Sequence, residues 1–162
     1  MGTQLVQNPD GSVSLRSDAD AIDHLRVGGP IAPSVASPRW SNEKTVKVPL
    51  AAAASAGGVL AWQNPETGAV IVTGLVIDLT TKSTGAGTAS FGTAANGTTS
   101  SANLIDTLDV GTATGTFDNN TDKGAAGKTR QRLAAGAFVT GSQATGAVAG
   151  LAGYAYITYI PV

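Results

Sequence analysis

The segment AVIVTGLVIDLT, residues 69–80, is the strongest indication of the fold in this chain. Aliphatic and β-branched residues dominate it, and such residues favour β-strands. Gly74, in its middle, allows a bend without breaking the strand. The apolar run is much shorter than the ~20 residues that a membrane-spanning helix needs. We therefore expect a long, buried strand here and no membrane partner.

Shorter strand candidates lie on both sides of this segment, at residues 44–50, 58–63, 87–93, 115–119, 129–133, 137–144 and 151–160. Residues 103–111 fit either a short helix or a strand. Turn residues separate the candidates roughly every 8–12 positions, a spacing typical of sandwiches and barrels. The two main apolar runs, 69–80 and 151–160, are distant in sequence, which suits jelly-roll closure. The predicted fold is all-β: a jelly-roll-like antiparallel β-sandwich at residues 44–162, with an extended N-terminal arm.

The arm, residues 1–43, contains four prolines and little sustained periodicity. Within it, residues 17–29 (SDADAIDHLRVGG) match a short helix, with a polar cap at its start and a glycine near its end. A segment with so little core of its own gains order most readily by burial against a partner. The candidate residues for that contact are Ile22, Leu25, Ile31, Val35 and Trp40.

The composition excludes several classes of function. Charged residues make up 13% of the 162-residue chain and the net charge is −1. Typical soluble domains carry about 25% charged residues, so this surface has no strong field to attract nucleic acid or an anionic membrane. The chain has no cysteine, which excludes disulfides, thiolate metal sites and thiol catalysis.

The segment DNNTDKGAAGKT, residues 118–129, resembles two ligand loops at once. Its GKT ending matches a phosphate-binding loop, but Asp122 holds the place of the required first glycine, so we predict no nucleotide site. Asp118, Asn120 and Asp122 alternate as in a calcium loop, but Thr129 holds the place of the closing glutamate. These three residues are weak metal candidates. The alternative is a turn, because Asp and Asn side chains bind nearby backbone.

The chain offers little for catalysis. His24 is its only histidine, and the nucleophile motif G-x-S-x-G is absent. Asp20 and His24 fit an ion pair on the arm helix, and we interpret Asp106 and Asp109 as surface groups. We therefore predict no catalytic residue, no cofactor and no enzymatic activity. An enzyme that uses Lys128, or the carboxylates of the 118–129 loop, is the alternative.

Tyrosines cluster near the C-terminus. Strand alternation places Tyr154 and Tyr156 on one face and Tyr159 on the other. Core packing or a subunit interface is the usual role of such a stripe, and we take all three tyrosines as candidates for an oligomer interface. A carbohydrate-binding face is the alternative.

Residues 76–119, which include TTKSTGAGTASFGTAANGTTSSANLIDTLDVGTA, and the ending GYAYITYIPV resemble head decoration (cement) proteins of tailed bacteriophages. The resemblance covers about residues 70–162. It implies a jelly roll that binds the major capsid protein as a homo-oligomer, often a trimer. It further implies location on the capsid surface of the virion after synthesis in the host cytoplasm, and no catalytic residues. The alternative is a carbohydrate- or receptor-binding sandwich of a phage head fibre or tail.

Overall fold

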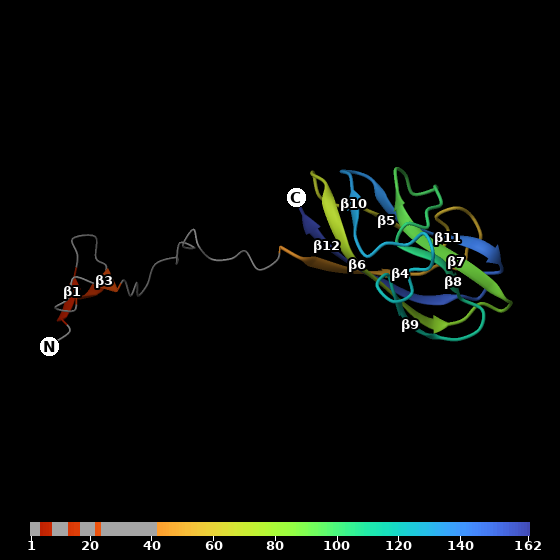
Figure 1. Ribbon diagram of the computed structural model, residues 1–162, viewed down its shortest axis with the longest axis horizontal. Coiled ribbons are helices and arrows are strands. Elements are labelled where there is room, and N and C mark those ends of the chain that lie inside the picture. The colour runs from red at the N-terminus through yellow and green to blue at the C-terminus, as the bar shows by residue number, and fades with distance from the viewer. Residues whose placement is uncertain (1–3, 8–12, 17–21, 24–41) are drawn as a thin grey trace. The chain divides into compact units, whose positions relative to one another are not determined.

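A computed structural model describes residues 4–7, 13–16, 22–23 and 42–162 of the chain (Figure 1). The chain divides into two compact units, Met1–Trp40 and Ser41–Val162. The described residues contain strands and loops but no helix, and so none that could span a membrane. The prediction of an all-β fold is confirmed.

The N-terminal unit contains a three-stranded antiparallel sheet of order β1-β2-β3, made of β1 (Gln4–Gln7), β2 (Val13–Arg16) and β3 (Ile22–Asp23). Because Gln7 pairs with Val13, the first two strands flank the turn sequence NPDGS. β3 pairs with β2 through Ile22 and Arg16.

The helix predicted at residues 17–29 is therefore wrong at Ile22 and Asp23, which form a strand. They pair with Arg16 and Leu15 of β2 in an antiparallel ladder, which is incompatible with helical geometry there. The rest of that helix lies outside the described residues. So do four of the five arm candidates: Leu25, Ile31, Val35 and Trp40.

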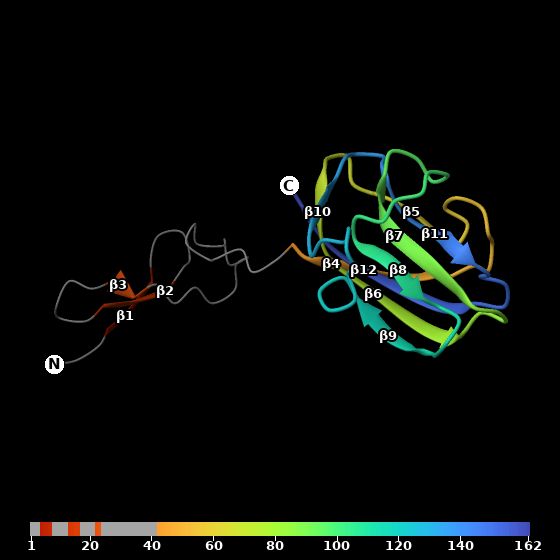
Figure 2. The same ribbon diagram turned by 45° about the vertical axis from the view of Figure 1, so that its right-hand side comes forward.

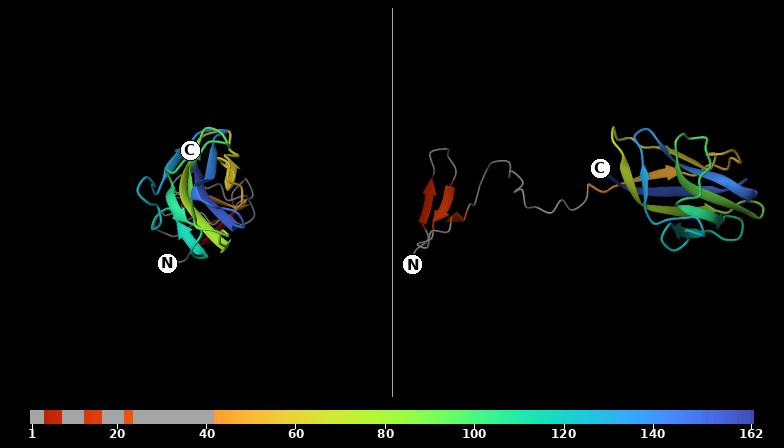
Figure 3. Two further views of the ribbon diagram at one scale, coloured as in Figure 1. Left: turned by 90° about the vertical axis from the view of Figure 1, so that its right-hand side faces the viewer. Right: turned by 45° about the horizontal axis from the view of Figure 1, so that its top comes forward.

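The second unit folds into two antiparallel sheets packed face to face. Sheet I has the order β10-β6-β12-β4, with β9 also paired to β6, and sheet II has the order β5-β11-β7-β8. In Figure 3 the dark blue β12 runs between the orange β4 and the yellow-green β6. The strands are β4 (Lys44–Pro49), β5 (Leu60–Gln63), β6 (Val70–Thr81), β7 (Gly87–Ala94), β8 (Ile105–Asp109), β9 (Gly115–Asp118), β10 (Gln131–Leu133), β11 (Phe138–Gly146) and β12 (Ala152–Pro161).

The strand pairs are nested along the chain. β7 pairs with β8, β6 with β9 and β10, β5 with β11, and β4 with β12. Two further pairings, β6 with β12 and β7 with β11, join these hairpins into the two sheets. A long hairpin rolled up in this way is a jelly roll, and both predicted apolar runs, β6 and β12, are adjacent at its centre.

β9 and β10 act as two halves of one interrupted strand. β9 pairs with β6 at residues 76–79 and β10 pairs with it at residues 70–72. Because β12 occupies the other edge of β6, both short strands lie along the same edge (Figure 2). The chain between them, residues 119–130, leaves the sheet as a loop.

A β-bulge keeps the apolar side of β6 facing inward. Thr158 pairs with Gly74, but the next residue, Tyr159, pairs with Val72, so Thr73 is an extra residue. The extra residue shifts the alternation of side chains along β6 by one position. Val72 and Leu75, three residues apart, therefore both point into the core, and both are fully buried. The bend predicted at Gly74 is this bulge.

The core lies between the two sheets and consists mainly of aliphatic side chains around Phe91, which is fully buried. Each buried Leu, Ile or Phe contributes roughly 1.5–3 kcal/mol of transfer free energy. Gly141, opposite Phe91 in the sheet, makes room for the ring, because a Cβ there would lie 2.6 Å from two ring atoms. The core is thus closed within the second unit.

Candidate functional site

The outer side of sheet I carries an aromatic surface. Along β12, Ala155 and Ile157 point into the core, so Tyr154 and Tyr156 point outward. Tyr154 is 37% exposed and Val76, on the neighbouring β6, is 36% exposed. We define the tyrosine face by five side chains on the outer side of sheet I: Lys47, Val76, Asp78, Tyr154 and Tyr156.

These side chains form two rows across the strands. In one row Tyr156 pairs with Lys47 of β4 on one side and with Val76 of β6 on the other. In the next row Tyr154 lies between Pro49 and Asp78. Side chains opposite one another within a row lie about 4.5–5.5 Å apart, and diagonal neighbours in adjacent rows lie about 7–8 Å apart, within reach of aromatic side chains, so the two rows form one continuous surface.

Lys47 crosses from its own row to the next. Its ammonium lies 3.6 Å from the ring centroid of Tyr154 and 5.6 Å from that of Tyr156. The attraction between a cation and an aromatic ring holds the lysine over the tyrosines. Within the described part of the chain, the one salt bridge joins Lys44 and Glu66, so neither Lys47 nor Asp78 has an ionic partner there.

The outer side of sheet II differs because loops of the same unit cover it. Thr140 and Ser142 point outward from β11, yet they are 0% and 2% exposed. The Thr140 hydroxyl donates to the Thr99 carbonyl, and the Ser142 hydroxyl accepts from the Gly57 amide. The tyrosine face has no such cover among the described residues.

Tyr159, predicted together with Tyr154 and Tyr156 as an interface candidate, belongs to the core. It is 5% exposed, and its ring lies 5.2 Å from that of Trp62. Its hydroxyl donates to the Glu66 carboxylate, which Lys44 also binds. Burial and the nearby Glu66 charge raise the pKa of the Tyr159 hydroxyl. The predicted separation of the tyrosines onto two faces is confirmed.

The weak metal candidates belong to a self-contained turn. The Asp118 carboxylate accepts from the backbone amides of Asn120 and Thr121, at 2.6 and 2.8 Å, and from the Thr121 hydroxyl. These bonds lower the pKa of Asp118. Asp122 accepts from the Asp118 amide and the Thr121 hydroxyl. The turn interpretation accounts for both carboxylates, and no group of three or more His, Cys, Asp or Glu among the described residues could hold a metal.

Asn119, between two of the metal candidates, is the residue that the sequence interpretation missed. It is 3% exposed. Its side-chain oxygen accepts from the Leu75 amide, and its side-chain nitrogen donates to the carbonyls of Lys128 and Thr129. Asn119 thus fastens both ends of the loop to β6, in the gap between β9 and β10. An Asn in an Asn/Asp-rich loop gave no sign of this burial.

The loop that ends in the GKT sequence packs against β8 through Gly124. Gly124 has a φ of 67°, and a Cβ there would lie 2.3 Å from the Asp106 carbonyl. The Asp106 amide donates to the Lys123 carbonyl, and the Ala126 amide donates to the Asp106 carboxylate. The glycine therefore serves close approach and left-handed geometry.

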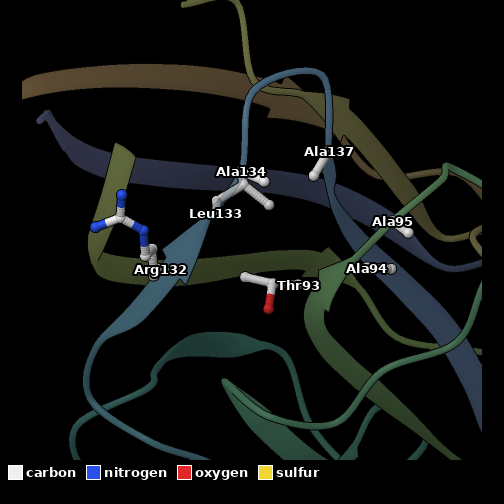
Figure 4. A pocket seen from close by; sticks show the side chains of 7 residues that line it. All are labelled: Thr93, Ala94, Ala95, Arg132, Leu133, Ala134 and Ala137. Carbon is white, nitrogen blue, oxygen red and sulfur yellow. The ribbon is translucent and has the colours of Figure 1, made fainter. Parts of the chain in front are cut away.

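A shallow hollow of about 240 Å³ lies beside β10 and is lined by Thr93, Ala94, Ala95, Arg132, Leu133, Ala134 and Ala137. Five of its seven lining residues are alanine or leucine, and the Arg132 guanidinium points away from the others (Figure 4). The Thr93 hydroxyl accepts from the Asn103 amide group. Arg132 is therefore the one charged side chain of the lining, and the hollow lacks the several convergent polar groups that orient a ligand.

Comparison with known proteins gave no match. No family model, curated protein or solved structure matches the chain. The resemblance to phage decoration proteins remains a prediction from the sequence.

Proposed function

We propose that the protein is a non-catalytic structural component of a phage virion that binds the outside of the capsid shell. The resemblance of residues 76–119 and 153–162 to decoration proteins supports this proposal. The jelly-roll topology, which that resemblance implies, is also the topology of the second unit. A fold alone does not define a function, so the proposal also needs support from a site.

The proposal rests on a contrast within the second unit between loop carboxylates that are hydrogen-bonded internally and aromatic side chains that are exposed. The carboxylates of its most reactive-looking loop accept hydrogen bonds from that loop's own backbone. Its uncovered surface is instead a flat face that carries Tyr154, Tyr156 and Val76. A flat aromatic surface is suited to binding another macromolecule, because burial of its rings supplies association energy.

In this proposal the two units have separate tasks. The second unit has a closed core of its own and stands on the outside of the shell. The N-terminal unit attaches to the major capsid protein, through a surface that includes Ile22 and the apolar residues that follow it. The protein is made in the host cytoplasm and joins the capsid surface there.

Deletion of residues 1–43 tests the attachment. The full chain should sediment with capsid shells at a fixed copy number, and the truncated protein should remain in the supernatant. Lys123→Asp, a charge change at an exposed position of the second unit, serves as the control and should still sediment. Equal binding by the truncated and full chains would contradict the role of the N-terminal unit.

A carbohydrate-binding module is the second candidate, and the exposure of Tyr154, with Tyr156 partly exposed beside it, is the observation that favours it. Exposed aromatic rings on a sheet are suited to stacking against apolar faces of sugars. A glycan array with the full chain tests this candidate. Reproducible binding that Tyr154→Ala removes would support it, and absence of binding at high protein concentration would contradict it.

A further inference from the structure

We propose that the tyrosine face binds a second copy of this chain, in a contact with two-fold symmetry. This inference concerns the purified protein alone, so it does not depend on attachment to a capsid. It also differs from the homotrimer that the sequence resemblance implies.

The tyrosine face is unusually apolar for the solvent side of a sheet. The solvent side of an antiparallel sheet is usually polar. Here the outer side of sheet I carries Tyr154 and Val76 at 37% and 36% exposure, with Tyr156, Ile71 and Ile160 partly exposed beside them. Ile71 pairs with Ile160 and Val76 with Tyr156, and the row between these two apolar pairs holds Thr158 opposite Gly74. Apolar side chains that stay exposed on a sheet face mark a surface that gains free energy when it is covered.

The β4 edge of sheet I disfavours pairing with a strand of another copy. β4 is the outer strand of sheet I, and Lys44, Lys47 and Pro49 occupy it. Lysine and proline on an edge strand oppose the addition of another strand, because one brings charge and the other lacks an amide. Addition of a strand at this edge is therefore disfavoured, and at the opposite edge β9 and β10 leave no single continuous strand to pair with.

Opposite charges flank β12, with Lys47 on β4 and Asp78 on β6. A two-fold axis parallel to β12, above the face, places β4 of one copy over β6 of the other at the same height along the strands. The Lys47 ammonium lies at the height of Tyr154, 3.6 Å from its ring centroid. Asp78 pairs directly with Tyr154 and therefore lies at that height on β6. The operation thus brings Lys47 of each copy to Asp78 of the other.

This complementarity is specific to a two-fold contact. An isologous interface uses the same patch on both copies, so the Lys47–Asp78 pair occurs twice. The tyrosines lie near the axis, where β12 of one copy faces β12 of the other. Both charged groups have no ionic partner within the described residues, so pairing across the contact would satisfy each of them.

The area indicates a contact of modest strength. β12 has 10 residues, or about 33 Å of strand, and four strands side by side span about 19 Å. Their product is on the order of 600 Å² per copy, or about 1,200 Å² for the pair, at the lower end of specific interfaces. We therefore expect a dimer whose population depends on concentration.

Analytical ultracentrifugation of the full chain, from about 1 to 500 μM, tests the proposal. The average mass should rise from that of one chain to that of two. Lys47→Asp and Asp78→Lys should each weaken the dimer by roughly tenfold or more, because each places like charges opposite one another. The double variant should recover dimer formation. Lys123→Asp, a charge change in the 119–130 loop, is the matched control and should dimerise normally.

The decisive measurement mixes the two single variants. One then carries Asp at both positions and the other carries Lys at both, so every cross-contact pairs opposite charges. The mixture should form a heterodimer although neither variant dimerises alone. Circular dichroism of each variant establishes that it is folded. A monomer at all concentrations, a trimer, or a dimer that ignores these charges would overturn the proposal. Glycan binding that Tyr154→Ala removes from a monomeric protein would also overturn it.

Discussion

Thr107 in β8 is the one described residue other than glycine with a positive φ, at 55°. A left-handed conformation costs a residue with a Cβ about 1–2 kcal/mol, and β-branched residues adopt it especially rarely. Thr107 adopts it in a bulge, where its amide donates to the Ser90 hydroxyl. The left-handed conformation of Thr107 is therefore a local backbone strain at the bulge where β8 pairs with β7.

Thr107→Gly should stabilise the protein. Glycine relieves the left-handed strain but adds about 0.5–1 kcal/mol of backbone entropy cost, so the net gain should be up to ~1 kcal/mol. The Ser90 bond uses the backbone amide and remains. Thr116→Gly, at an exposed position in β9 without positive φ, is the matched control and should destabilise. Urea denaturation measures both, and equal losses of stability would contradict the strain argument.

The Asp118 carboxylate should make stability depend on pH. Hydrogen bonds from the Thr121 and Asn120 amides lower its pKa in the folded state. A lowered folded-state pKa stabilises the protein above the unfolded value of about 3.9, and this stabilisation is lost as pH falls through the folded-state pKa. Asp118→Asn keeps an acceptor for the turn but removes the charge.

The variant should therefore be less stable than the natural protein at pH 7, and the difference should disappear towards pH 2. Denaturation curves of both proteins across this range provide the measurement. A difference that is independent of pH would show that the charge of Asp118 contributes nothing to the turn.

At the scale of elements, bulges explain what the sequence could and could not predict. In β8, Ile105 and Leu108 are both buried, three residues apart, because the bulge at Thr107 inserts an extra residue between them. A spacing of three is also a helical spacing, which is why residues 103–111 fitted either a helix or a strand. In β6 the glycine beside the bulge gave a usable signal.

The interrupted strand formed by β9 and β10 depends on one buried side chain. Asn119→Ala would leave the Leu75 amide and two loop carbonyls without their partner. The buried Leu75 amide costs about 1–3 kcal/mol when unsatisfied, and the two carbonyls cost less because their residues are exposed, so the variant should lose roughly 2–4 kcal/mol of unfolding free energy. Thermal and urea denaturation measure this loss.

Asn120→Ala is the matched control for this prediction. Asn120 is exposed, and it contributes its backbone amide to the turn. Its truncation should change stability by no more than about 0.5 kcal/mol. Similar losses in both variants would contradict the role assigned to Asn119. The sequence could not distinguish these two neighbours, because only the path of the loop across β6 buries one of them.

At the scale of the molecule, the β-rich class and the jelly roll could be predicted, since they follow from strand spacing and from the two distant apolar runs. The tyrosine face was predictable only in part. Alternation separated Tyr154 and Tyr156 from Tyr159, but it could not tell which side faces the core. That depends on which side of sheet I packs against sheet II, and so on contacts between residues distant in sequence, such as Trp62 with Tyr159.

The second unit should fold without the first. Its core residues all lie between Leu50 and Tyr159, and the nested strand pairs close within the same unit. A protein of residues 42–162 should therefore show the same near-ultraviolet circular dichroism as this unit in the full chain. It should unfold cooperatively, within a few degrees of the full chain's main transition. The control is Leu75→Ala in the fragment, which removes a fully buried side chain and should lower the unfolding free energy by about 2–5 kcal/mol. An isolated fragment that lacks a cooperative transition would show that the N-terminal unit completes its core.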